Sequence, residues 1–182
     1  IELESNRKIF DKKINNNFKI FPIPKNNIKL KNLNYKYPGR EELALKNINI
    51  NIPINKKIAF VGKTGSGKTT AANQILCLLR PLSGDLLIDD KPLSSSEISY
   101  WQSLCSYVPQ SINLLNSDIL SNVAYGLKTN EINEKKVWDS LRAAQIYELV
   151  YNLPDQLYTK VGENGIRLSG GQRQRIAIAR AF

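Results

Sequence analysis

The most regular alternation of hydrophobic and polar residues lies between positions 48 and 52. Ile48, Ile50 and Ile52 alternate there with Asn49 and Asn51. Because successive side chains of a β-strand point to opposite faces, this period of two places isoleucine on one face and asparagine on the other. The pattern predicts a strand that is buried on its isoleucine face and solvated on its asparagine face.

Further apolar segments predict more strands and a helix. Residues 57–62, KIAFVG, are almost continuously apolar, as in a strand covered on both faces. A helical pattern follows at residues 67–80, and shorter apolar runs predict strands at residues 85–90 and 105–109. Mixed strands and helices of this kind favour an α/β core.

Two segments predict the remaining helices. Ser94 and Glu97 have the spacing of a capping box, which opens a helix. Residues 117–150 have a helical pattern, because apolar residues recur there at helical spacing. These residues are Val137, Leu141, Ala144 and Leu149. The segment therefore predicts a helical insertion in the α/β core.

The chain of 182 residues is long enough for one sizeable domain. Residues 1–27 are rich in asparagine and lysine and lack a period, which predicts a linker or extended arm before a domain at residues 28–182. The chain begins with Ile1 rather than Met, so we expect a piece of a longer product. No apolar run approaches the roughly 18 residues that a membrane span needs.

The chain has a formal net charge of +10. This charge fits a nucleic-acid or anionic-membrane partner, but it also fits lysines spread over solvated faces. We favour the second interpretation, because composition alone is weak evidence, and retain only a position near anionic lipid. Cys77 and Cys105 lie in apolar segments without the spacing of metal ligands, which predicts buried thiols in a reducing compartment.

The stretch GKTGSGKT, residues 62–69, matches G-x-x-x-x-G-K-[ST] between a predicted strand and a predicted helix. Gly65 and Gly67 allow a tight turn and a close approach to phosphate oxygens. The N–H groups of such a loop and of the helix start form a concave anion site. Lys68 can reach the β- and γ-phosphates, and the Thr69 hydroxyl can bind Mg²⁺. The full match predicts a phosphate-binding loop rather than an ordinary glycine turn.

A second polar glycine turn, LSGGQ, lies at residues 168–172 and opens another predicted helix. Ser169 offers a hydroxyl, and Gly170 and Gly171 allow close backbone approach to an anion that the helix dipole favours. The turn by itself also fits an ordinary serine-capped helix. Its presence in a chain that already has a phosphate loop favours a second phosphate contact.

In this order, the motifs resemble the nucleotide-binding domain of ATP-binding cassette (ABC) proteins over residues 28–182. GKTGSGKT is similar to the Walker A loop of that family, and LSGGQRQR is similar to its signature. The resemblance implies an α/β fold, a P-loop NTPase core with an antiparallel β subdomain and a helical subdomain inserted at about residues 112–167. It also implies ATP and Mg²⁺ as cofactors.

The resemblance implies roles for single residues. Tyr37, in YKYPGR, falls at the aromatic that stacks on adenine, with Tyr35 as a less favoured alternative. Gln110, in YVPQ, falls at the glutamine that contacts the Mg²⁺ and water region. Lys68 and Gln110 are the implied catalytic residues, and Thr69 and Gln110 the implied metal contacts. The implied nucleotide contacts are Tyr37, Gly62, Lys63, Thr64, Gly65, Ser66, Gly67, Lys68, Thr69, Thr70, Ser169, Gly170, Gly171 and Gln172.

The stretch TKVGENG, residues 159–165, resembles the segment that contacts the coupling helices of membrane domains in exporter-type cassettes. The resemblance implies an exporter at the cytoplasmic face of the cell membrane, with transmembrane domains as partners. It further implies a head-to-tail dimer in which the loop of one domain faces the signature of a second. No nucleic-acid partner is expected.

In the family, a Walker B strand with its acidic residues and a switch histidine follow the signature. This sequence has no histidine, and its hydrophobic run that ends in acids, LLIDD at residues 86–90, precedes the signature. Because DDKP is typical of a turn, we predict a strand and turn there rather than Walker B. We therefore expect a domain that is incomplete at its C-terminus and hydrolyses ATP negligibly as this chain alone.

Two alternatives remain. A soluble ABC ATPase that acts on nucleic acid or the ribosome is compatible with the charge, but VGENG and the short spacing between the two phosphate turns disfavour it. An unrelated P-loop kinase does not predict LSGGQ.

Overall fold

The computed structural model describes residues 23–182, so most of the predicted arm at residues 1–27 lies outside the described residues. The chain divides into two compact units, of which the first ends at Cys105 and the second comprises Ser106–Phe182. Helices and strands both occur, as the α/β prediction requires, and all the strands of the described residues lie in the first unit. Each unit is described by itself.

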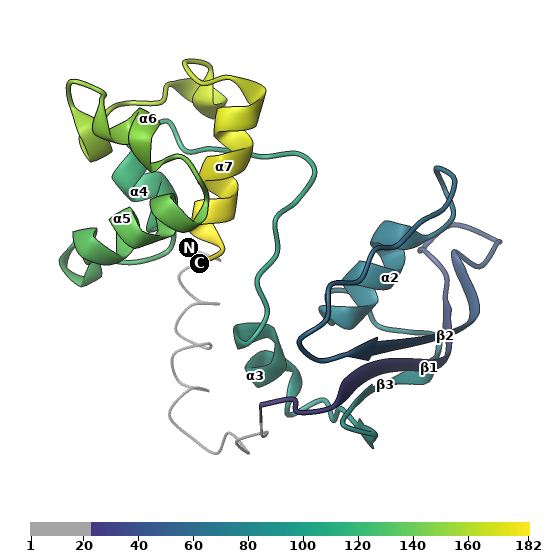
Figure 1. The fold of residues 1–182 in the computed structure, drawn as a ribbon. Helices are drawn as coiled ribbons and strands as arrows, with labels where there is room; N and C mark the ends of the chain where they lie inside the picture. Colours follow the sequence, from purple (N-terminus) through teal and green to yellow (C-terminus); the bar gives the residue numbers. More distant parts are fainter. Residues whose placement is uncertain (1–22) are drawn as a thin grey trace, which may run out of the picture. The chain divides into compact units, whose positions relative to one another are not determined.

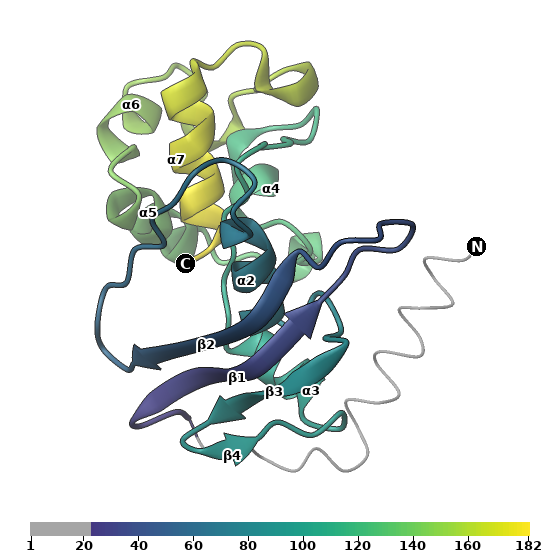
Figure 2. The same cartoon turned by 90° about the vertical axis from the view of Figure 1, so that its right-hand side faces the viewer.

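The first unit contains a four-stranded antiparallel sheet in the order β2-β1-β3-β4 (Figure 2). The strands are β1 (Asn27–Tyr35), β2 (Leu45–Pro53), β3 (Ser83–Ile88) and β4 (Lys91–Pro92). In β2 the isoleucines are half-buried and the asparagines exposed, so the predicted alternation is confirmed.

The helices α2 (Lys68–Ile75) and α3 (Ile98–Ser103) pack with the sheet in one hydrophobic core. Ala71 of α2 and Trp101 of α3 are buried there with Leu30, Leu33 and other residues of the strands. The Trp101 indole also donates a hydrogen bond to the main-chain oxygen of Ile75, 2.6 Å away, and so ties α3 to the end of α2. The core therefore holds the start of α2, where the phosphate-loop motif ends, against the sheet.

Asparagine side chains compensate an irregularity on the polar face of β1 and β2. The pairing of β1 and β2 shifts after Leu30, and Asn32 and Asn47 both have a φ of 49°. The Asn49 side chain accepts a hydrogen bond from Asn32 N at 3.0 Å, and the Asn34 side chain accepts one from Asn47 N at 2.8 Å. Asparagine suits these positions because it tolerates positive φ and satisfies unpaired main-chain groups.

Two predicted strands are wrong. Residues 57–62 and 105–109 are irregular, and the side chain of Val61 is 93% exposed. A strand forms only where a neighbour completes its hydrogen bonds, and no strand of residues 23–182 pairs with either segment. An apolar run signals that a segment can be buried, but it does not supply the ladder partner.

The helices of the first unit differ from the prediction at their ends. α2 ends at Ile75 rather than near Arg80, because Cys77 adopts a φ of 52°, which a helix does not accommodate. The predicted contact between Ser94 and Glu97 forms, with Ser94 N donating to the Glu97 carboxylate at 2.8 Å. It shapes a turn directly before α3 rather than the first turn of the helix.

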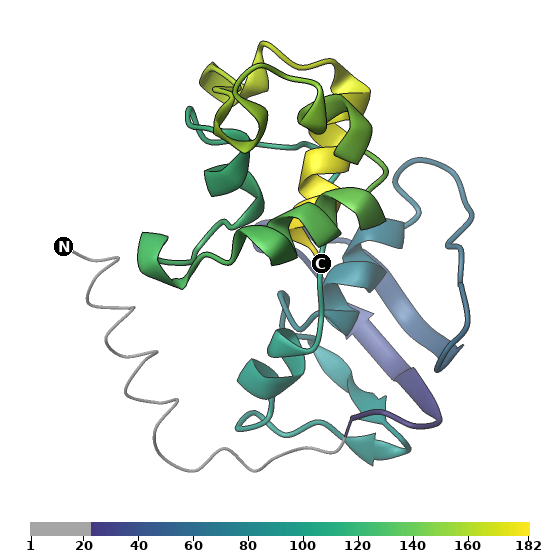
Figure 3. The ribbon, with the colours of Figure 1, turned by 60° about the vertical axis from the view of Figure 1, so that its left-hand side comes forward.

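The second unit is helical, with α7 (Gly170–Arg180) packed against α4 (Ile119–Val123) and α5 (Glu134–Ala143) (Figures 1 and 3). A fourth helix, α6, spans Tyr147–Tyr151, and 3-10 turns lie at Thr129–Glu131, Gln156–Tyr158 and Glu163–Gly165. The predicted helical stretch of residues 117–150 is therefore broken into three helices.

Local caps explain the breaks in this unit. The Asp118 side chain accepts a hydrogen bond from Ser121 N at 2.7 Å and opens α4, and the Asn133 side chain accepts one from Lys136 N and opens α5. Val137 and Leu141 are buried at helical spacing, as predicted.

Within residues 23–182, no helix combines the length and the hydropathy that crossing a bilayer requires.

Candidate functional site

The phosphate-loop motif is an exposed, irregular segment that leads into α2. Gly65 and Gly67 have φ values of 83° and 84°, a left-handed conformation that glycine adopts without a steric penalty. Gly67 precedes α2 directly and no side chain caps the helix. The first N–H groups of α2 therefore lack intrahelical partners and remain available to an anion.

The ammonium group of Lys68 lies over this loop. It donates hydrogen bonds to the main-chain oxygens of Gly62 at 2.8 Å and Lys63 at 2.7 Å, and lies 3.5 Å from Ser66 Oγ. The loop thus curls around a positive charge placed beside the free N–H groups of α2. Charge and donors converge as the binding of a phosphate group requires.

Gly67 joins the loop to the start of β2. A Cβ atom built on Gly67 would lie 2.9 Å from the main-chain oxygen of Ala44 and 2.8 Å from Cδ2 of Leu45. Only glycine fits this approach. The residue type at position 67 therefore fixes the distance between the phosphate loop and the connection that leads from β1 to β2.

That connection carries Tyr37, and the structure brings this residue to the phosphate-loop helix. The Tyr37 hydroxyl lies 3.0 Å from Oγ1 of Thr70 in α2. The Tyr35 ring lies against the Tyr37 ring in a T-shaped contact, with 4.9 Å between centroids. Pro38 and Gly39 form the turn that follows, closed by a hydrogen bond from Arg40 N to Tyr37 O at 3.1 Å. Thr70 was predicted only as one of the nucleotide contacts that the resemblance implies, so its pairing with Tyr37 is a feature that sequence reasoning missed.

Thr69 is the candidate metal contact within this unit. Its side chain is exposed on the first turn of α2 and forms no hydrogen bond in the described part of the chain. Residues 23–182 contain no group of three or more acidic, histidine or cysteine side chains that could hold a metal by themselves. One hydroxyl beside a phosphate site fits Mg²⁺, which binds through few protein ligands together with substrate phosphates and water.

The second glycine turn opens α7. Ser169 is the N-cap, with its hydroxyl accepting from Gln172 N at 3.2 Å and its own N–H donating to the Gln172 side chain at 2.8 Å. A Cβ atom built on Gly170 or Gly171 would meet no atom within 4 Å. The ordinary capping box is therefore present, and the glycines leave the backbone open to another molecule.

Arginine side chains fix α7 within the helical unit. Arg173 donates to the main-chain oxygen of Leu168 at 3.1 Å, and Arg175 donates to the main-chain oxygen of Gln145. Arg180 donates to the main-chain oxygens of Asn122 and Asn113, and burial lowers the pKa of its guanidinium. Sequence reasoning missed these contacts, because basic residues on a helix are expected to face solvent.

The other predicted residues of the second unit lie in turns. Gln110 is exposed in an irregular segment. Val161 is buried and donates from its N–H to Ser117 O at 3.0 Å, whereas Glu163 is exposed. The structure thus presents a carboxylate on a firmly held turn. Gln110 and Ser169 belong to the second unit and Lys68 to the first.

The acids of LLIDD form a hairpin turn, as predicted. Asp89 and Asp90, with φ values of 49° and 66°, are the two residues between the paired positions Ile88 and Lys91. The Asp89 carboxylate accepts hydrogen bonds from three main-chain N–H groups at residues 25–27, which lower its pKa. Both acids therefore have a structural role.

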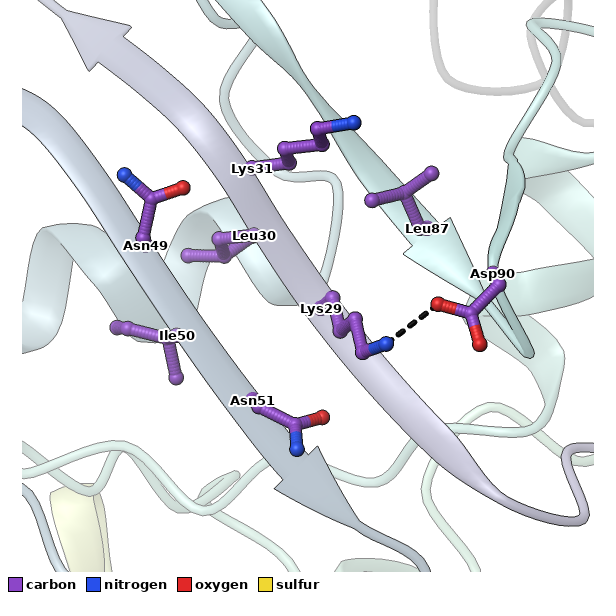
Figure 4. A pocket seen from close by; sticks show the side chains of 8 residues that line it. All are labelled: Lys29, Leu30, Lys31, Asn49, Ile50, Asn51, Leu87 and Asp90. Atoms are coloured by element: carbon purple, nitrogen blue, oxygen red, sulfur yellow. Dashed lines mark hydrogen bonds and ion pairs between the residues drawn. The ribbon is translucent and has the colours of Figure 1, made fainter.

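A groove of about 570 Å³ lies along the sheet (Figure 4). Its lining residues are Lys29, Leu30, Lys31, Asn49, Ile50, Asn51, Leu87 and Asp90. Lys29 and Asp90 form an ion pair at its edge and neutralise each other. None of the predicted site residues lines this groove, so it is not part of the candidate site.

Comparison with known proteins identifies what the chain is similar to. Residues 45–182 match the family model described as "ABC transporter". The chain is 40% identical over 158 residues to an "ATP-dependent lipid A-core flippase" of Pectobacterium atrosepticum, which covers 87% of this chain and 27% of that protein. A flippase of the same name from Haemophilus influenzae is 38% identical over 93% of this chain and 29% of its own length. The chain thus spans less than a third of the relatives it matches.

A solved structure is similar in fold. It is described as "Structure of a bacterial Atm1-family ABC exporter with ATP bound", and it superimposes with a TM-score of 0.78. The match covers 98% of this chain and 32% of that one, at 27% identity.

Proposed function

The chain belongs to the ABC transporter family, and from this premise we propose that it is the ATP-binding domain of an exporter. The observation that carries the proposal is the convergence at the start of α2. There the Lys68 ammonium group lies over the glycine loop beside the uncapped N–H groups of α2, and Tyr37 is hydrogen-bonded to the same helix. These groups match the two ends of ATP, its phosphates and its base.

Different residues of the first unit bind the phosphates and the base of ATP. The N–H groups of residues 62–70 hold phosphate oxygens, and Lys68 leaves the main-chain oxygens it contacts to bind the β- and γ-phosphates. The Tyr37 ring stacks on adenine, a contact worth about 1–3 kcal/mol when measured on nucleic-acid bases.

Mg²⁺ and hydrolysis require a second set of residues. When bound, Mg²⁺ neutralises charge on the phosphates. The Thr69 hydroxyl and the Gln110 side chain would hold the ion, and Gln110 would also orient the attacking water. Lys68 and Gln110 are the residues of this chain that act on the reacting phosphate.

The complete exporter joins two such domains and membrane domains. Ser169, Gly170, Gly171 and Gln172 of one domain contact the ATP on the phosphate loop of the second. Residues 28–182 form the nucleotide-binding domain, with a helical subdomain at about 112–167 that meets the transmembrane domains through the turn around Glu163. The domain works at the cytoplasmic face of the cell membrane. The soluble, nucleic-acid-acting alternative gains no support from the relatives, which are named as flippases, or from the similar solved structure, which is named as an exporter.

The test of ATP binding is calorimetry on the complete gene product with Lys68→Ala. Hydrogen bonds to charged groups are worth about 1.5–3 kcal/mol, so the affinity for Mg-ATP is expected to fall by about 10- to 150-fold. Lys56→Ala, which removes an exposed lysine outside the loop, is the control and leaves affinity unchanged. Equal affinities of Lys68→Ala and the parent protein would contradict the site.

Export is tested separately from binding. The complete gene product is expected to sediment with membranes, because an exporter works together with membrane-spanning segments, whether these belong to its own chain or to a partner. ATPase activity in those membranes should disappear with Lys68→Ala. Recovery of the protein in the soluble fraction would favour the soluble alternative.

A further inference from the structure

We propose that Thr70 is a positioning residue whose hydroxyl fixes the Tyr37 ring as the platform for adenine. This inference rests on the proposed ATP site and goes beyond it. It assigns to the Thr70 side chain a role in recognition of the base, although Thr70 directly follows the phosphate-binding motif.

The Tyr37 ring needs such a restraint. Its side chain is 38% exposed and lies in the connection between β1 and β2, outside regular structure. An exposed tyrosine samples several rotamers, and ordering it on binding weakens affinity. A ring held in advance avoids that loss.

Thr70 is suited to supply the restraint. Its side chain is 6% exposed, and its main chain lies in α2, only two residues after Lys68. The position of its hydroxyl is therefore set by the same helix that presents the phosphate donors. Because the Tyr37 hydroxyl lies 3.0 Å from the Thr70 hydroxyl, the Thr70 side chain also restrains the Tyr37 ring.

Tyr35 limits the remaining motion without blocking the ring. Tyr35 is buried in β1 and its ring lies at 84° to that of Tyr37, a favourable T-shaped arrangement. Such a contact occupies at most one of the two faces of the Tyr37 ring. Tyr35 therefore leaves at least one face of the ring for stacking on a base, in a side chain that is 38% exposed.

Two further contacts keep the connection in place. Ala44 N donates to Tyr35 O at 2.8 Å, and Gly67 approaches the main chain of Ala44. The connection that carries Tyr37 therefore meets the phosphate-loop segment at two points, through Ala44 beside Gly67 and through the Tyr37 hydroxyl beside Thr70. These two contacts set the spacing between the base site and the phosphate site.

The experiment compares affinities for ATP and for inorganic triphosphate, which lacks the base, in the complete gene product. Tyr37→Phe and Thr70→Val each remove one of the two hydroxyls, and with it the hydrogen bond between them, while an aromatic ring remains at position 37. Each is expected to weaken ATP binding about 2- to 10-fold, the range of one neutral hydrogen bond, while the affinity for triphosphate is unchanged. The double variant should be no weaker than either single variant, and Thr70→Ser, which keeps a hydroxyl, should restore the parent affinity.

Four outcomes would overturn the proposal in distinguishable ways. Additive losses in the double variant would show that the two hydroxyls act independently. Equal weakening of ATP and triphosphate by Thr70→Val would assign its hydroxyl to the phosphates. Tyr37→Ala tests the adenine contact apart from the restraint. If it weakens the binding of ATP alone, while Tyr37→Phe and Thr70→Val leave the ATP affinity unchanged, the Tyr37 ring contacts adenine but the hydroxyl contact does not position it. No ATP-specific loss in Tyr37→Ala rejects both the restraint and the adenine contact.

Discussion

Arg180 at the end of α7 is held by Asn122 of α4 through two hydrogen bonds. Its Nε donates to the main-chain oxygen of Asn122 at 2.8 Å, and a terminal nitrogen donates to the Asn122 side-chain oxygen at 3.1 Å. Asn122 is fully buried, and the same side-chain oxygen accepts from Leu115 N at 2.8 Å. One amide thus joins α7 to α4 and to the segment that precedes it.

Asn122→Ala is expected to loosen the helical unit. The substitution leaves the Leu115 N–H without its acceptor, at a cost of about 1–3 kcal/mol for a neutral group. It also removes one hydrogen bond of the Arg180 guanidinium, which keeps its bonds to the main-chain oxygens of Asn122 and Asn113. Hydrogen exchange at the Leu115 amide measures the effect and should accelerate. Asn130→Ala, which changes an exposed asparagine of the same unit, is the control. Unchanged protection of Leu115 would contradict this role.

Gly67→Ala is expected to lower both stability and ATP affinity. An alanine at a φ of 84° is strained by about 1–2 kcal/mol, and its Cβ would collide with Ala44 O. Gly126→Ala isolates the strain, because Gly126 has a φ of 89° and open space around its Cβ position. Thermal unfolding and calorimetry should show a loss of ATP affinity for the first variant alone. An equal loss of ATP affinity in Gly67→Ala and Gly126→Ala would show that the approach of Gly67 to Ala44 does not matter for binding.

Cys77 is expected to react slowly at neutral pH. Burial, together with the nearby Cys105, raises the pKa of Cys77 to about 11, and the thiolate is the reactive form. Alkylation of Cys77 should therefore accelerate with every unit of pH up to about 11. Since an unfolded cysteine ionises near pH 8.5, this thiol stabilises the fold fully below that pH and loses its contribution as the pH rises toward 11. Iodoacetamide kinetics with Cys105→Ser isolate the reaction, and a rate that levels off near pH 8.5 would contradict the burial argument.

This chain alone is expected to hydrolyse ATP negligibly. It has no histidine, and Asp90 is engaged with Lys29 in a hairpin turn. Release of phosphate by the purified 182-residue chain should therefore stay at background. Turnover that disappears with Asp90→Asn would mean that the hairpin acid takes part in catalysis.

Mixing of variants tests which chain completes which site. In the complete gene product, Lys68→Ala damages the phosphate loop, and Ser169→Arg puts bulk and charge at the open turn before α7. In a head-to-tail dimer, one site of the mixed pair collects both changes and the other is intact. Mixing should restore ATP-dependent association and one tightly bound ATP for each dimer. No restoration, with both variants folded and exchanging partners, means that each chain uses its own turn.

The sequence by itself determined the local features. The alternation in β2, the glycines at positive φ in the phosphate loop, the Ser169 cap and the Asp89–Asp90 turn all followed from residue type and spacing. These features depend on φ and ψ preferences and on hydrogen bonds between neighbours, so a short window of sequence contains all the necessary information.

Only the tertiary structure decided the long-range contacts. Residues 57–62 have the composition of a buried strand, yet they remain irregular, because no strand of residues 23–182 pairs with them. The pairings of Tyr37 with Thr70 and of Asn122 with Arg180 join residues 33 and 58 positions apart. Such contacts depend on which distant groups the packed core brings within hydrogen-bonding distance, and no periodicity within one segment encodes that choice.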